Sequence, residues 1–298
     1  MQRLQVGQKI CAGRFVIQSL LGIGGSGEVY LAQELSGETP KLVALKVFTE
    51  NTSSETSILE LHDRIHREAD ALSKIKHESI IRASEVINTG EMTILVQEYL
   101  AGGTLHDAIR RDPHEFKKPY TWLNLACNLA EGLEAVHSAG ISHGDIKPGN
   151  IGFRDLAQSH PVYLDFGQAS LVNSGDFLTR SAQAMATLPY LAPERTGFVK
   201  SMREEQSDLY SLGATLYEIA AGHPPFEDST PKALLEKILN GVPEPLHEIV
   251  EDFPVPLSDL VQKLLRKNPE DRYFTARGLA ADIRVCLEEL ESKGKIKS

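Results

Sequence analysis

The pattern of apolar residues changes about a third of the way along this chain of 298 residues, and that change constrains the fold more than any other feature. The first hundred residues contain short apolar runs rich in β-forming residues, at residues 15–21, 41–48 and 93–99. Such runs, bounded by Gly, Ser or Pro, predict β-strands. Between them, apolar residues recur at helical spacing over residues 58–75, which predicts one amphipathic helix.

The rest of the chain has mostly helical spacing. Apolar residues recur in this way over residues 120–139, and residues 209–221 are apolar nearly all round. The second pattern predicts a helix that is buried in a core. Further helices are predicted near residues 230–240, 256–267 and 275–291.

We therefore predict an α+β fold with two lobes, in a single domain over residues 1–298. A small β-rich lobe covers about residues 10–98, a hinge about 98–103, and a larger α-helical lobe about 104–292. A chain of this length has room for a sizeable core in each lobe.

Composition and charge exclude several classes of protein. No run approaches the roughly 18 apolar residues of a membrane span, and no apolar run follows the N-terminus as in a signal peptide. The net charge of −10 disfavours nucleic acid as a partner. Cys11, Cys127 and Cys286 are far apart, which disfavours a disulfide framework or a zinc site and fits the reducing cytoplasm.

Two short segments carry the residues of phosphoryl transfer. Residues 142–150 read SHGDIKPGN, and Asp165 follows fifteen residues later at the head of an Asp-Phe-Gly triplet. Asp145 can accept a proton from a hydroxyl, and Lys147 can neutralise a phosphoryl group in transfer. Asn150 and Asp165 offer the hard oxygen ligands that magnesium prefers. A polar turn could account for any one of these residues, but not for the whole set at these spacings.

A glycine-rich run precedes these segments. Residues 22–29 read GIGGSGEV, and glycines of this kind let a β-hairpin fold closely over phosphate groups. A dinucleotide-binding fold uses a similar run but needs a helix directly after it, whereas residues 29–32 have the pattern of a second strand. On its own, the run fits a phosphate-binding hairpin and a plain hairpin equally well.

Lys46 lies in a predicted strand among apolar neighbours. Glu68 falls on the core-facing stripe of the predicted helix, together with Ile65 and Leu72. An unpaired carboxylate there would be costly, so we expect Glu68 to pair with Lys46. The pair would hold the ammonium group against the α- and β-phosphates of a nucleotide.

From about residue 13 to 290, the chain resembles the eukaryotic-like protein kinases, and its bacterial members most closely. The motifs stand in that family's order, with the glycine run, VALK at 43–46, HGDIKPGN at 143–150, DFG at 165–167, APE at 192–194, SDLYSLG at 207–213 and NPEDR at 268–272. Lys147 and Thr187 resemble the serine/threonine branch. The resemblance implies that Glu194 pairs with Arg272. It also implies that Asp208 anchors the backbone of residues 142–150, the catalytic loop.

The resemblance also implies the reactants and the site. It implies that Leu72, His143 and Phe166 stack, and that Thr187 contacts Asp145 and Lys147. Adenine would bond to the backbone of Glu98 and Leu100, with Gln97 as gatekeeper. The reactants would be ATP with Mg²⁺ or Mn²⁺ and protein substrates, including a second copy of the chain in trans, in the cytoplasm. The implied nucleotide site consists of Gly22, Ile23, Gly24, Gly25, Ser26, Gly27, Val29, Ala44, Lys46, Gln97, Glu98 and Leu100.

The chain departs from this family's pattern at Gly144, where an arginine is usual. In the family, that arginine binds a phosphorylated residue of the activation segment through charge-assisted hydrogen bonds. We therefore predict that the activation segment here does not strictly depend on phosphorylation at Ser170, Ser174, Thr179 or Ser181. Arg154 or Arg180 could substitute for the missing arginine.

Two other functions are weighed against a protein kinase. Small-molecule kinases of the aminoglycoside and choline type also have a His-Gly-Asp sequence, but they lack the APE segment that this chain has 29 residues after Asp165. A catalytically dead scaffold usually lacks Lys46, Asp145, Asn150 or Asp165, and all four are present. Both alternatives are therefore disfavoured.

Overall fold

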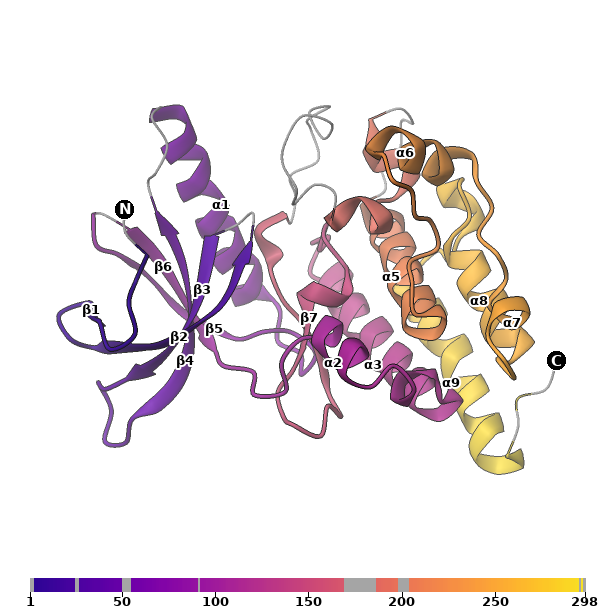
Figure 1. Cartoon of the computed structure of the whole chain (residues 1–298), viewed down its shortest axis with the longest axis horizontal. Helices are drawn as coiled ribbons and strands as arrows, with labels where there is room; N and C mark the ends of the chain where they lie inside the picture. Colours follow the sequence, from indigo (N-terminus) through magenta and orange to yellow (C-terminus); the bar gives the residue numbers. More distant parts are fainter. Residues whose placement is uncertain are drawn as a thin grey trace.

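The protein has two lobes of different secondary structure (Figure 1), as the sequence predicts. The computed structural model describes residues 3–24, 27–49, 55–90, 92–168, 186–197, 204–294 and 296. The smaller lobe contains one long helix, α1 (Glu55–Lys74), beside a sheet with the strand order β1-β2-β3-β4-β6-β5. Its strands, all paired antiparallel, are β1 (Lys9–Ile10), β2 (Phe15–Gly24), β3 (Gly27–Glu34), β4 (Lys41–Thr49), β5 (Ala83–Asn88) and β6 (Met92–Glu98).

The predicted strands are confirmed as β2, β3, β4 and β6, and the predicted helix is confirmed as α1. Two strands were not predicted. β1 has only two residues, and β5 contains no fully buried residue and lies at the edge of the sheet. Because neither strand has an apolar run, the sequence carries no clear strand signal there.

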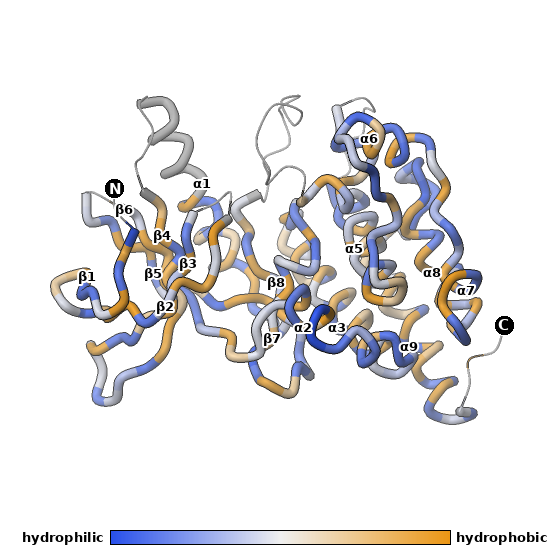
Figure 2. The backbone as a smooth tube through the Cα atoms, in the orientation of Figure 1, coloured by the Kyte–Doolittle hydropathy of each residue, from blue (hydrophilic) through white to orange (hydrophobic). Residues whose placement is uncertain are grey.

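The sheet of the smaller lobe has apolar residues on both faces. One face, with Phe15, Tyr30 and Leu45, forms a core of its own. On the other face, Phe48 and Leu95 belong to the core that includes α1 and continues into the larger lobe. Figure 2 shows hydrophobic stretches on the strands of the smaller lobe and along the helices of the larger one.

The larger lobe is mainly helical. Besides its helices, it contains a short hairpin of β7 (Ile151–Phe153) and β8 (Pro161–Tyr163). Among the described residues, no helix is both long and apolar enough to cross a membrane. The helices in the described part of this lobe are α2 (Leu105–Arg111), α3 (Pro119–Ser138), α5 (Glu204–Ala221), α6 (Pro231–Asn240), α7 (Leu246–Ile249), α8 (Val255–Leu264) and α9 (Ala276–Lys293).

Helix α5 is the buried helix that the sequence predicts, and it begins five residues earlier than expected. Gly213 allows close packing at its centre, because a Cβ atom there would lie 2.6 Å from Cβ of Leu264 in α8. The short helices α2 and α7 were not predicted. The start of α2 nevertheless has a capping box, in which Thr104 and Asp107 exchange hydrogen bonds.

Glu194 and Arg272 form a buried ion pair, as the resemblance implies. The Nη1 and Nη2 atoms of Arg272 lie 2.7 and 2.8 Å from the two carboxylate oxygens of Glu194, and the side chains are 0% and 2% exposed. Ser207 at the start of α5 donates a further hydrogen bond of 2.7 Å to Glu194. The guanidinium group also donates to the carbonyl groups of Gln206, Arg266 and Lys267.

We predict that Arg272→Ala lowers the free energy of unfolding by about 3–5 kcal/mol, because it leaves the buried carboxylate of Glu194 without its cation. Urea denaturation would measure the change. A matched control is Arg277→Ala, which removes an ion pair to Glu134 from a side chain that is 77% exposed. That variant should lose less than about 1 kcal/mol. Equal losses in the two variants would contradict the prediction.

Candidate active site

Lys46 is shared by two carboxylates, one from each lobe. Strand β4 carries it between Val29 of β3 and Leu95 of β6. Its Nζ atom lies 2.8 and 2.7 Å from the two carboxylate oxygens of Glu68 in α1, and 2.8 Å from Oδ1 of Asp165 in the larger lobe. The predicted pair of Lys46 and Glu68 is therefore present, and Asp165 joins it.

The three side chains form a largely buried charge cluster. Lys46 is 5% exposed, Glu68 0% and Asp165 23%. Burial alone would lower the pKa of Lys46, but the charges of Asp165 and Glu68 outweigh it and hold the pKa above its ordinary value. Lys46 is thus a fixed cation at neutral pH.

The hairpin of β7 and β8 brings Asn150 and Asp165 together. Ile151 pairs with Tyr163, and the next backbone hydrogen bond runs 2.9 Å from Leu164 N to Asn150 O. Asp165, which follows Leu164, has a left-handed backbone with φ of 56°. Its Oδ1 atom accepts a 3.2 Å hydrogen bond from Gly167 N, which supports this turn.

Asp145 is held by the side chains of two residues that follow it. Lys147 Nζ lies 3.0 and 2.8 Å from its two carboxylate oxygens. The amide nitrogen of Asn150 donates 2.8 Å hydrogen bonds to Oδ2 and to the backbone oxygen of Asp145. Lys147 also donates a 2.7 Å hydrogen bond to the Thr187 hydroxyl, so Thr187 is linked to Asp145 through Lys147.

Asp208 at the start of α5 anchors the backbone just before Asp145, as the resemblance implies. Its carboxylate accepts hydrogen bonds from the backbone N–H groups of His143 (2.7 Å) and Gly144 (2.9 Å). Nε2 of His137 lies 3.1 Å from the same carboxylate. Complete burial would raise the pKa of Asp208, but its hydrogen bond with His137 and nearby positive charges lower it below the ordinary value.

His143 is a buried, neutral ring that connects the catalytic loop to the Asp-Phe-Gly segment. Burial lowers its pKa. Its Nε2 atom lies 2.9 Å from Leu164 O, and its Nδ1 atom accepts a 3.3 Å hydrogen bond from Asp145 N. The ring centroids of His143 and Phe166 are 4.6 Å apart, and Leu72 belongs to the same core. The contact between His143 and Phe166 that the resemblance implies is therefore present.

The glycine run forms a hairpin between β2 and β3. Gly22 pairs with Val29, Ile23 with Glu28, and Gly24 with Gly27. Gly27 needs to be glycine, because its φ is +125° and a Cβ atom would lie 2.5 Å from Val47 O. Gly25 and Ser26, which are predicted to contact phosphate, lie outside the described residues.

The residues predicted to hold adenine lie at the end of β6. Gln97 pairs with Ala44 of β4 and is 9% exposed. Glu98 is the last residue of β6, and Leu100 lies between the strand and α2. Ala44 and Gln97 thus lie side by side on adjacent strands, and Glu98 and Leu100 follow Gln97 along the chain.

Arg154, suggested as a substitute for the arginine missing at position 144, bonds to the end of β6 in this structure. Its Nη2 atom lies 2.8 Å from Oε1 of Glu98 and 2.9 Å from Ile80 O. Arg180 lies outside the described residues, as do Ser170, Ser174, Thr179 and Ser181.

Several hydrogen bonds of this region were not predicted from the sequence. His137, Ser207, Arg154 and Arg195 all donate or share hydrogen bonds with residues of the predicted motifs. His137 lies in the last turn of α3, five residues before Ser142, where a polar side chain on a buried face could have been noticed. Arg195 directly follows the APE segment and has no sequence signal of its own.

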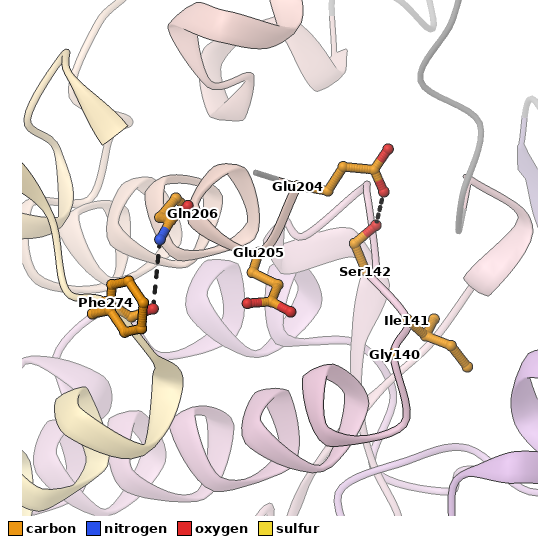
Figure 3. Close-up of a pocket in the computed structure, with 7 residues that line it drawn as sticks. All are labelled: Gly140, Ile141, Ser142, Glu204, Glu205, Gln206 and Phe274. Carbon is orange, nitrogen blue, oxygen red and sulfur yellow. Dashed lines mark hydrogen bonds between the residues drawn. The ribbon is translucent and has the colours of Figure 1, made fainter. Parts of the chain in front are cut away.

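A separate pocket of about 380 Å³ lies where the turn after α3 meets the start of α5 (Figure 3). Ser142 donates a 2.6 Å hydrogen bond to Glu204 at its edge, and Gln206 a 3.5 Å bond to Phe274 O. Glu204 and Glu205 lie in the first turn of α5, where acidic residues stabilise the helix. None of the predicted nucleotide or metal ligands lines this pocket.

Comparison with known proteins identifies the family. The family model for the protein kinase domain matches residues 15–282, which is most of the chain. The chain therefore belongs to the protein kinase family. The order of motifs, the two lobes and the contacts around Lys46 and Asp145 agree with this membership.

The most similar curated proteins include bacterial serine/threonine-protein kinases. The chain is 33% identical to pkn2 of Myxococcus xanthus over 273 residues, covering 90% of this chain and 32% of pkn2. It is 31% identical to PknB of Mycobacterium leprae, covering 91% of this chain and 42% of PknB. It is 31% identical to PkaA of Streptomyces coelicolor, covering 92% and 50%. The chain thus spans between about a third and a half of the length of these relatives.

We predict that Lys46→Met lowers the free energy of unfolding by about 3–5 kcal/mol at pH 7, because two carboxylates lose their shared cation. The deficit should shrink as the pH falls toward about 5, since protonation removes an uncompensated buried charge. Denaturation at several pH values would measure it. Lys74→Met, which removes only an exposed ion pair to Asp70, is the control. A deficit in Lys46→Met that does not change with pH would contradict the prediction.

Proposed function

We propose that this chain is a serine/threonine protein kinase that transfers the γ-phosphate of ATP to Ser or Thr hydroxyls of proteins. One observation carries the proposal. The carboxylate of Asp145 forms an ion pair with Lys147, and Lys147 donates a hydrogen bond to the hydroxyl of Thr187. Thr187 lies seven residues before the buried Glu194. A carboxylate that can accept a proton thus lies next to the segment from Thr187 to Glu194, which the buried ion pair of Glu194 fixes in place and which can bind a peptide.

Each side chain has a role that its contacts support. Asp145 orients the attacking hydroxyl and accepts its proton, and Lys147 neutralises charge on the phosphoryl group. Lys46, fixed by Glu68, holds the α- and β-phosphates. Because these groups are positioned before substrate binds, they stabilise the transition state without rearrangement.

Asn150 and Asp165 are suited to hold Mg²⁺ or Mn²⁺. Asn150 uses its amide nitrogen to bond Asp145, which leaves its carbonyl oxygen as a possible ligand atom, and Asp165 supplies a carboxylate. The described residues contain no group of three or more His, Cys, Asp or Glu side chains placed to hold a metal. A metal here would take its remaining ligands from phosphate oxygens and water. Once bound, the cation would neutralise charge on those phosphates.

The remaining features of the proposal concern the nucleotide, the lobes and the location. Adenine would bond to the backbone of Glu98 and Leu100, with Gln97 beside it, and the glycine hairpin would cover the phosphates. The hinge would lie at about residues 98–103. We place the enzyme in the cytoplasm, in keeping with its three free cysteines. A second copy of the chain would be one protein substrate, in trans.

The proposal predicts label transfer from γ-labelled ATP with Mg²⁺ or Mn²⁺ to Ser or Thr of the protein itself or of a generic basic protein. Asp145→Asn should abolish transfer because the proton acceptor is gone, and Asp165→Ala should reduce it to near background. Aminoglycosides and choline would be offered in parallel. Label only on these small molecules would support the small-molecule kinase, and nucleotide binding without any transfer would support a scaffold.

The absence of an arginine at position 144 leads to a second prediction about activity. A variant with Ser170, Ser174, Thr179 and Ser181 all changed to Ala should retain substantial transfer to the generic basic protein. The measurement is kcat for that protein, with circular dichroism to check the fold. A folded variant without activity would refute the idea that the activation segment does not strictly need phosphorylation.

A further inference from the structure

Gly144 is an unusual residue to precede a proton acceptor. It has a left-handed backbone with φ of 83°, which glycine adopts readily. The same freedom makes the peptide between residues 144 and 145 easy to reorient, because glycine has no side chain to pack. If Asp145 is to keep one orientation, other groups must hold this peptide.

The N–H side of Gly144 is held from α5. Asp208 accepts its hydrogen bond at 2.9 Å, from a helix that is buried along most of its length. The next amide, Asp145 N, donates to His143 Nδ1 at 3.3 Å. These contacts fix the amide groups on either side of the Gly144 carbonyl, but they do not bond the carbonyl itself.

Arg195 holds the carbonyl side. Its Nη1 atom donates a 2.7 Å hydrogen bond to Gly144 O. The guanidinium group is also near enough to Asp208 for its charge to help lower the pKa of that carboxylate. Charge-assisted hydrogen bonds of this kind are about twice as strong as neutral ones. Arg195 thus interacts with the Gly144 carbonyl through a hydrogen bond and with the Asp208 carboxylate through its charge.

The position of Arg195 is itself fixed. It lies in the 3-10 helix Pro193–Thr196, directly after Glu194, and its backbone N–H bonds to Ala192 O at 2.9 Å. Glu194 is locked by Arg272 and Ser207. The arginine therefore extends from a rigid support, and its contact connects the APE segment to the catalytic loop.

We propose that Arg195 is a positioning residue, which holds the peptide before Asp145 in place and couples it to the APE segment. The inference rests on the proposed function only in taking Asp145 as the proton acceptor. The contact of Arg195 with Gly144 can be tested without any assay of activity.

The test compares Arg195→Ala, Arg195→Gln and Arg195→Lys with the wild-type chain. Loss of a charge-assisted hydrogen bond should lower kcat for a generic basic protein roughly ten- to a hundredfold in Arg195→Ala. KM for ATP should stay within about twofold, because Arg195 is not among the residues that hold the nucleotide. Arg195→Lys keeps a charged donor and should retain more kcat than Arg195→Gln.

Hydrogen exchange supplies the readout that is independent of activity. Amides in residues 140–147 should exchange faster in Arg195→Ala than in the wild-type chain, and amides of α3 and α9 should not change. Arg284→Ala is the control, because it removes an ion pair with Glu131 on the surface between α3 and α9. It should leave both kcat and the exchange of residues 140–147 unchanged.

The two proposals can fail separately. Faster exchange in Arg195→Ala with a wild-type chain that phosphorylates no protein would support the role of Arg195 and refute the proposed function. An active wild-type chain, with kcat and exchange unchanged in all folded Arg195 variants, would overturn the role of Arg195. If Arg195→Ala does not fold, Arg195→Lys and Arg195→Gln decide, and equal activity with unchanged exchange in both would also overturn it.

Discussion

Asp208 carries a negative charge inside the larger lobe, and the catalytic loop is arranged around that charge. A buried carboxylate is tolerated only when donors surround it, and two of its donors are the backbone amides of His143 and Gly144. Satisfying Asp208 therefore requires the loop to turn sharply at residue 144. After this turn, the carboxylate of Asp145 lies where Lys147 and Asn150 donate hydrogen bonds to it. The position of Asp145 thus follows from the electrostatic needs of a residue that takes no part in chemistry.

Lys46 links the two lobes, because it is shared by one carboxylate from each of them. Glu68 comes from the smaller lobe and Asp165 from the larger one. Glu68 is fully buried, whereas Asp165 is partly exposed, so the part of this cluster that solvent can reach lies on the larger lobe. If the proposed metal binds at Asn150 and Asp165, it would add a second cation beside the Asp165 carboxylate, whereas Asp145 already has Lys147 beside it.

Sequence alone predicted the fold class and the pairs whose members carry opposite charges within recognisable motifs. Lys46 with Glu68 could be deduced because a carboxylate on a core-facing stripe needs a cation. The edge strand β5 could not, since its residues are at most half-buried and show no apolar run. Nor could the contact of Arg195 with Gly144, because a side chain that bonds a backbone carbonyl 51 residues away leaves no pattern in the spacing of residues. Contacts to the backbone depend on the folded path of the chain, which motifs do not encode.

Both ends of the segment from Thr187 to Arg195 form hydrogen bonds with the catalytic loop. Thr187 bonds Lys147 and Arg195 bonds Gly144, so the two contacts flank Asp145 in the sequence. Between them, Tyr190 O accepts a 2.8 Å hydrogen bond from Ser211 of α5, and Glu194 is locked by Arg272. A segment held by neutral and charged groups of the protein itself has less need of an added phosphate to order it. The segment from Thr187 to Arg195 is thus ordered by contacts that need no arginine at position 144.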